Sequence, residues 1–141
     1  MMQVLIAHPI GAKNTLLQTI VDNAGCDPKQ VQTFSDAIDI LREDQAPILL
    51  LSENFDRGQV LELIPVFKHL RKGLKIILLA DTTSVGFLRQ ARAAGIFYHA
   101  LPPQDSDDGQ ELKLVLECAR EASEKQKSPV WSRIAPLFGA N

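Results

Sequence analysis

The chain has 141 residues, of which 45% are hydrophobic and 23% are charged, as is typical of one soluble globular domain. A formal net charge of -2 leaves no face that must be basic, which argues against direct nucleic-acid binding. The apolar N-terminal stretch, residues 4–7, is far shorter than the roughly 20 residues of a membrane span. We therefore expect a cytoplasmic protein without membrane attachment.

Apolar runs alternate with stretches of helical spacing along the chain. The predicted strands are residues 2–7, 31–34, 47–51, 75–80 and 96–101. The predicted helices are residues 12–24, 36–41, 60–70 and 85–94. A fifth, long helix is predicted to begin at the acidic segment 105–108 and to run through residue 122. Such alternation predicts an α/β fold with a parallel, doubly wound sheet and helices on both faces.

Several residues mark the predicted ends of these elements. Gly25 and Gly95 are expected to end the helices before them, because glycine readily adopts the left-handed conformation of a helix C-cap. Ser35 is expected to cap one helix and the cluster 81–84 another. Pro65 is expected to kink its helix or to delay its start, since proline lacks the N–H that a helix interior needs.

The most apolar run, residues 47–51, predicts a central strand that is buried on both faces. Ser52 follows it directly, and the carboxyl ends of parallel strands are where open α/β sheets bind ligands. Cys26 and Cys118 have no Cys-x-x-Cys or Cys/His spacing, so we expect two buried thiols rather than a disulfide or a zinc site. No metal or cofactor is predicted.

Three local patterns and their spacing resemble the receiver domains of bacterial response regulators. They are Ala-Ile-Asp-Ile-Leu at 37–41 leading into the strand at 47–51, Val-Leu-Glu-Leu-Ile at 60–64, and Ala-Arg-Ala-Ala-Gly at 91–95. The resemblance covers about residues 2–124 and implies a flavodoxin-like, five-stranded sheet of order 2-1-3-4-5. Residues 125–141 are predicted to be a linker and a short apolar tail.

The resemblance also implies where phosphoryl transfer would take place. Receivers use a carboxylate pair after the first strand, an acceptor aspartate after the third, a hydroxyl after the fourth and a lysine before a proline after the fifth. Here those positions hold His8, Pro9, Ser52, Ala80 and Pro102. Without the carboxylates and the lysine, phosphoryl transfer loses its Mg²⁺ site and most of its electrostatic stabilisation. We therefore predict a vestigial pocket, no catalytic residue and no enzyme activity.

Other interpretations of the pocket remain open. A displaced acidic residue, Glu53, Asp56 or Asp81, could take the phosphoryl group, although side chains alternate across a strand. Ser52 and His8 could form a nucleophile and base if they lie within hydrogen-bond reach. The uncharged pocket could instead bind a small molecule. Before Pro103 a cis peptide bond is plausible.

The preferred interpretation is a pseudo-receiver that acts through protein–protein contact in a bacterial two-component or transcriptional system, with a protein partner or as a homodimer. In receivers the fourth helix, fifth strand and fifth helix form the usual contact face. The candidate interface residues here are Arg89, Arg92, Tyr98, His99, Lys113, Trp131 and Phe138. Trp131 and Phe138 belong to an apolar stripe in the tail, and exposed stripes of this kind usually mark a contact.

Overall fold

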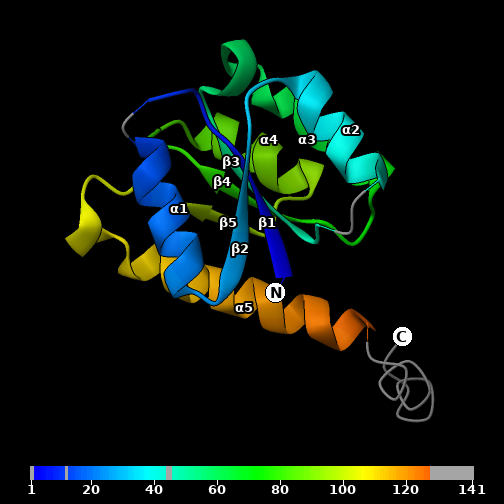
Figure 1. The fold of residues 1–141 in the computed structure, drawn as a ribbon. Coiled ribbons are helices and arrows are strands. Elements are labelled where there is room, and N and C mark those ends of the chain that lie inside the picture. The colour runs from blue at the N-terminus through cyan, green and yellow to red at the C-terminus, as the bar shows by residue number, and fades with distance from the viewer. Residues whose placement is uncertain (1, 12, 44–45, 128–141) are drawn as a thin grey trace, which may run out of the picture.

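The computed structural model describes residues 2–11, 13–43 and 46–127. Within these ranges the chain forms a five-stranded parallel sheet of order β2-β1-β3-β4-β5, as the sequence predicts. Figure 1 shows the sheet between two layers of helices, with α1 and α5 on one face and α2, α3 and α4 on the other. The fold is α/β, flavodoxin-like and doubly wound.

The described elements, in chain order, are β1 (Met2–Ala7), α1 (Lys13–Asn23), β2 (Cys26–Val31), α2 (Phe34–Glu43), β3 (Ile48–Ser52), the 3-10 turn η1 (Phe55–Gly58), α3 (Val60–Leu70), β4 (Lys75–Leu79), α4 (Val85–Ala94), β5 (Tyr98–Ala100), the 3-10 turn η2 (Ser106–Asp108) and α5 (Gln110–Lys127).

The core lies on both faces of β3, because all five residues of this strand are buried. Leu49 and Leu51 pack into the cluster under α2, α3 and α4, while Ile48 and Leu50 pack into the cluster under α1 and α5. Complete burial of one such aliphatic side chain stabilises a fold by about 1.5–3 kcal/mol. The uninterrupted apolar run is therefore explained by the two helical layers, which make polar alternation unnecessary.

The second strand begins earlier than the sequence suggests. The prediction of residues 31–34 was wrong, since β2 is Cys26–Val31 and pairs along β1 with Pro28 opposite Val4. A proline is tolerated there because β2 is an edge strand. Only Cys26 and Val31 of the strand are buried, so its apolar signal is weak.

Phe34, which was assigned to that strand, is the first residue of α2. Its ring centroid lies 5.5 Å from that of Phe67 on α3. Ser35 lies inside the helix and does not cap it; the hydroxyl of Thr33 accepts a hydrogen bond from Asp36 N at 3.1 Å instead. The apolar character of this stretch thus comes from helix packing and not from a strand.

Other predicted element boundaries are confirmed. Ser84 is the N-cap of α4, and its Oγ accepts a hydrogen bond from Phe87 N at 3.2 Å. Gly25 and Gly95 follow the ends of α1 and α4 with φ of 79° and 109°. The helix α3 begins at Val60, as predicted, and continues through Pro65, so of the two effects expected of this proline the late start was wrong.

The two cysteines differ in exposure. Cys26 is buried and Cys118 is exposed on α5, so the expectation of two buried thiols was wrong for Cys118. Trp131 and Phe138 lie outside the described residues. Among the described helices, none has the length and apolar character needed to cross a membrane.

The left-handed C-cap of α4 gives the first testable prediction. Gly95→Ala should lower the free energy of unfolding by about 1–2 kcal/mol, because an L side chain is disfavoured at this φ. The new Cβ would also lie 3.3 Å from Lys68 Cε. Urea denaturation measures the change.

Gly86→Ala on the same helix is the matched control. A Cβ at Gly86 meets no atom closer than 4.0 Å, and alanine is the better helix former there. We expect it to be neutral or stabilising by up to about 1 kcal/mol. Equal destabilisation by both variants would contradict the assigned role of Gly95.

Candidate functional site

The positions that the sequence assigns to a vestigial pocket gather at the carboxyl edge of the sheet. His8 and Pro9 follow β1, Ser52 ends β3, Ala80 follows β4 and Pro102 follows β5 by two residues. The register of the parallel strands brings these ends to one edge, since Ala7 pairs with Leu51, Leu51 with Leu78 and Leu79 with Ala100.

Ser52 is buried, with 4% of its surface exposed. Its Oγ accepts a hydrogen bond from Asn54 N at 3.2 Å, which satisfies a buried polar group at the turn after β3. A hydroxyl needs a nearby base to become a good nucleophile. The partner of this hydroxyl is a backbone N–H, which cannot take its proton.

His8 forms a separate set of contacts. Its Nδ1 lies 2.8 Å from Pro9 O and 3.1 Å from Asn14 Oδ1. Since a carbonyl oxygen only accepts, Nδ1 carries the proton. Gln30 Nε2 also donates to His8 O at 3.2 Å, which joins the end of β1 to β2. These contacts give His8 a structural role, and no hydrogen bond joins its ring to Ser52 in the described part of the chain.

Ala80 occupies the place of the fourth-strand hydroxyl, and both of its backbone polar groups are engaged. Ala80 N donates to Ala100 O at 3.1 Å, and His99 Nε2 donates to Ala80 O at 2.8 Å. The imidazole of His99 is therefore half-buried against the end of β4. Tyr98 points outward and is 41% exposed. His99 thus contacts a backbone carbonyl where a receiver switch would meet a hydroxyl.

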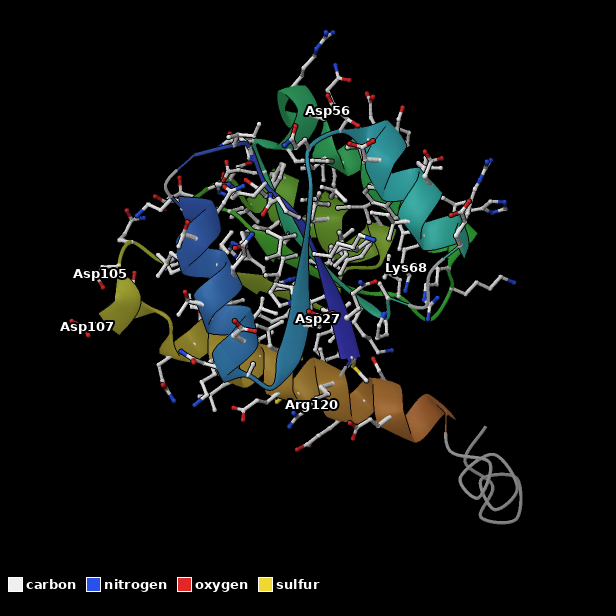
Figure 2. All side chains as sticks on the ribbon, viewed as in Figure 1. Asp27, Asp56, Lys68, Asp105, Asp107 and Arg120 are labelled. Atoms are coloured by element: carbon white, nitrogen blue, oxygen red, sulfur yellow. The ribbon has the colours of Figure 1, made fainter. Side chains whose placement is uncertain are left out.

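Two of the three carboxylates that could replace the missing aspartate, those of Glu53 and Asp56, bind backbone amides. Glu53 accepts a hydrogen bond from Asp81 N, and its own N–H donates to Leu79 O at 3.0 Å. Asp56 Oδ2 accepts from Phe34 N at 2.9 Å, so it caps the N-terminus of α2 from a neighbouring loop. Figure 2 shows Asp56 on the η1 turn near the start of α2, well away from Asp105 and Asp107 on the turn before α5.

The backbone around Asp56 is unusual. Asp56, Arg57 and Gly58 have φ of 45°, 74° and 76°, all in the left-handed region. A non-glycine residue in this region costs about 1–2 kcal/mol, with Asp among the better tolerated types. The bond from Asp56 to α2 offsets part of this cost, and it directs the carboxylate toward the helix.

A cavity of about 350 Å³ lies beside Pro102. Its lining is mainly acidic and polar, with Leu101 and Pro102 as the apolar part; the residues are Asp81, Leu101, Pro102, Gln104, Asp107, Asp108, Gln110 and Glu111. His8, Pro9, Ser52 and Ala80 do not line it. Among the described residues, no group of three or more His, Cys, Asp or Glu side chains is arranged to hold a metal ion.

Sequence reasoning missed two features of this edge. Lys13 Nζ donates to Gln104 O, so a cation from the start of α1 reaches the loop after β5. The side chains of Asn14 and Gln30 hold the end of β1. No spacing pattern pointed to these contacts, because tertiary packing sets which side chain meets which main-chain group. The described peptide bonds are all trans, including the one before Pro103, so the cis bond considered there is absent; trans is the lower-energy isomer even before proline.

The face formed by α4, β5 and α5 carries exposed apolar side chains. Phe97 is 38% exposed, Leu101 59% and Leu114 52%, and Tyr98 lies among them. A cavity of about 330 Å³ on this face is lined by Arg92, Ile96, Phe97, Tyr98 and His99. The remaining candidate on α4, Arg89, is exposed.

One predicted interface residue lies elsewhere. Lys113 lines a cavity together with Ile20 and Asn23 of α1, so it belongs to the flank of α5 that faces α1. Leu114 and Leu101, which the sequence analysis did not single out, are two further exposed apolar residues on the β5 side. Both look like core positions in a sequence, and only the structure shows their exposure.

Several solved structures with a similar fold are receiver domains. A CheY-like response regulator receiver domain from Methanospirillum hungatei superimposes with a TM-score of 0.74 at 17% identity, covering 89% of this chain and 98% of that one. A receiver domain protein from Clostridium thermocellum has a TM-score of 0.76 at 11% identity, with 88% and 98% covered. The chain has the receiver fold.

A third similar structure is the receiver domain of a sensor histidine kinase from Pseudomonas aeruginosa, which holds a magnesium ion in its active-site cleft. Its TM-score is 0.69 at 14% identity, with 83% of this chain and 95% of that one covered. At such identities the similarity establishes the receiver fold and no more. No family model and no curated protein match the chain.

The cap that Asp56 provides to α2 can be tested directly. Asp56→Ala should lower the free energy of unfolding by about 1–2 kcal/mol, since it removes the acceptor of Phe34 N and places alanine at a left-handed φ. Asp39→Ala, at an exposed position inside α2, is the matched control and should change stability by less than about 0.5 kcal/mol. Equal effects of the two variants in urea denaturation would contradict the capping role.

Proposed function

We propose that the protein is a receiver-like signalling module that is not phosphorylated and that acts through protein–protein contact, in a bacterial two-component or transcriptional regulatory system. The receiver fold supports a signalling role. The residues at the carboxyl edge of the sheet support the loss of phosphoryl transfer.

The environment of Ser52 carries the proposal. This residue ends the central strand, where a receiver has its acceptor aspartate, and it is buried with its Oγ bonded to Asn54 N. A serine ester would need a base to form, and a phosphoryl group would need cations around it. The chain offers His8 and Pro9 in place of the carboxylate pair, and Pro102 in place of the lysine.

The neighbouring carboxylates support the same conclusion. Glu53 accepts a hydrogen bond from the main-chain amide of Asp81, and Asp56 accepts one from the main-chain amide of Phe34. Phosphorylation of either group would remove its negative charge and weaken its hydrogen bond to that amide. Moving Asp56 would in addition uncap α2. Neither carboxylate is therefore arranged as an acceptor.

The apolar face of α4, β5 and α5 supports docking of a protein. Exposed apolar side chains that gather on one face usually mark a contact, and Phe97 and Tyr98 line one cavity here, while Leu101 and Leu114 are exposed after β5 and on α5. Exposed arginines, Arg89 and Arg92, flank them on α4. Aromatic residues and arginine are also the types enriched in protein interfaces.

Binding of a small molecule is the second candidate function, and the cavity beside Pro102 is the observation that favours it. Its carboxylates, from Asp81, Asp107, Asp108 and Glu111, suit a polar or cationic ligand better than the uncharged one that the sequence suggested. A rise in melting temperature with a cationic metabolite, lost in Asp108→Asn, would support this function.

Phosphoryl transfer is the first test. The protein incubated with Mg²⁺ and acetyl phosphate should show no added phosphoryl mass, because the acceptor and its stabilising charges are absent. Intact-mass spectrometry measures the adduct, with an active receiver domain as the positive control. An acid-stable adduct on Ser52, or an acid-labile one that disappears in Glu53→Gln or Asp56→Asn, would overturn the proposal.

The contact face can be tested by its self-association. If a second copy is the partner, light scattering should give a dimer mass that Tyr98→Asp reduces to that of a monomer, since the new charge would be buried in the interface. Val66→Asp, at a similarly exposed apolar position on α3, should leave the mass unchanged. A monomer at every concentration would exclude the homodimer and leave a different protein as the partner.

A further inference from the structure

The sheet has two end strands, β2 and β5, and their open edges differ in protection. β2 carries two charged residues and a proline, Asp27, Pro28 and Lys29, and these are the residue types that keep an edge strand from pairing with another chain. β5, Tyr98–Ala100, contains none of these types. Within the described residues, the strand that pairs with β5 is β4, on one side. The open edge of β5 is therefore the less protected of the two.

One residue of β5 directs its main chain to this open edge. Ala100 O accepts a hydrogen bond from Ala80 N at 3.1 Å, so the main chain of Ala100 faces β4. Successive residues of a strand point their main-chain groups to opposite edges, so the N–H and C=O of His99 point away from β4. The bend at Phe97, whose N–H donates to Ile76 O at 2.7 Å, lies before the strand and outside this alternation. His99 can thus exchange two hydrogen bonds with an added strand.

The cavity of about 330 Å³ on this edge has cations and aromatic rings around it. Its lining consists of Arg92 and the four consecutive residues 96–99, none of which is a carboxylate. Lys75 Nζ lies 6.0 Å from the centroid of the Phe97 ring, which places a second cation beside the cavity. Burial lowers the pKa of Lys75, and the nearby ammonium of Lys68 lowers it further. An anionic group at this place would offset the repulsion between the cations.

We propose that the open edge of β5 accepts an extended segment of a partner protein as a sixth strand, and that an acidic side chain of this segment enters the cavity beside Arg92. In strand addition, main-chain hydrogen bonds give affinity and pockets for alternate side chains give specificity. Here His99 supplies the main-chain groups, and the cavity supplies the pocket. Because β5 has three residues, it forms few main-chain bonds, and side chains must supply much of the affinity.

The charges indicate a different protein and not a second copy. The segment that a second copy would add, residues 96–101, contains no Asp or Glu to meet Arg92. A small anion also fits poorly, because a ligand pocket buries most of its ligand, whereas Arg92 is exposed and Phe97 and Tyr98 are 38% and 41% exposed. The partner segment therefore carries Asp or Glu, with β-branched or aromatic residues two positions away on the same face.

The inference rests on the proposed function in one respect, that a protein docks on the face of α4, β5 and α5. It does not depend on the chemistry at Ser52, since the edge of β5 is open in the unmodified protein. The two can therefore fail separately. A phosphoryl adduct on Ser52 together with acidic peptides bound at β5 would overturn the proposed function alone. No adduct, together with peptides that do not use β5, would overturn the strand addition alone.

Selection from a phage-displayed library of random heptapeptides, with the full-length protein as bait, tests the side-chain part of the inference. The selected peptides should contain Asp or Glu among β-branched or aromatic residues. A synthetic peptide of the selected sequence should bind Arg92→Glu at least about tenfold more weakly than the wild type. Arg89→Glu, an exposed position on the same helix that does not line the cavity, is the matched control and should change the affinity by less than about twofold. A selection that yields no peptide, peptides without an acidic residue, or an equal loss in both variants would overturn the proposal.

The variants His99→Pro and His99→Ala test the main-chain part. Both lose the imidazole, whose Nε2 donates to Ala80 O, but only proline also removes the N–H that faces the open edge. An edge strand tolerates proline where the N–H points out of the sheet. The synthetic peptide should therefore bind His99→Pro about fivefold more weakly than His99→Ala, as loss of one hydrogen bond predicts. Equal affinities for the two variants would overturn the proposal.

Hydrogen exchange gives an independent readout in the wild type. The bound peptide should slow the exchange of the His99 amide and leave the amides of β2 unchanged, because β2 is the protected edge. A peptide that binds without slowing exchange at His99 would contradict strand addition. Light scattering tests the remaining occupant: a dimer mass that is kept in His99→Ala and lost in His99→Pro would overturn the proposal in favour of pairing between two copies of β5.

Discussion

Burial of β3 on both faces is the constraint on which the remaining structure depends. Its five residues, Ile48 to Ser52, contribute to both core clusters and pair with β1 on one side and β4 on the other. A strand in this position must be apolar, and a polar group at its end must find a partner within the protein. Ser52 finds Asn54 N. The same burial that builds the sheet therefore also determines what the residue at the receiver's acceptor position can do.

Strong local signals made most of the fold predictable. The strands at 47–51 and 75–80 were recognised because two-sided burial requires continuous apolar sequence, and Ser84 and Gly95 marked helix ends by their own backbone chemistry. The second strand was misplaced because edge strands need no such sequence. It contains Pro28 and charged residues, while the apolar Phe34 nearby packs against Phe67 from within α2.

The sequence predicted which residues form the candidate site but not which groups they contact. The resemblance to receiver domains assigns the five positions at the strand ends, so His8, Ser52 and Ala80 could be named in advance. Their partners could not, because bonds such as Glu53 to Asp81 N and Lys13 to Gln104 O join loops that only tertiary packing brings together. The placement of Lys113 beside α1 was missed for a related reason, since the rotation of α5 is set by its packing.

The engagement of Ala80 through both its N–H and its carbonyl has a consequence for control of the protein. Ala80 N donates to Ala100 O, and Ala80 O accepts from His99 Nε2. Because alanine has no hydroxyl, the end of β4 lacks the group that would bind a phosphoryl group and shift between two positions. Under the proposed function, a signalling module without such a mark is regulated by its abundance. Its partner is occupied in proportion to how much of the module is made and how slowly it is degraded, as mass action requires. Synthesis and turnover would then set the strength of the signal.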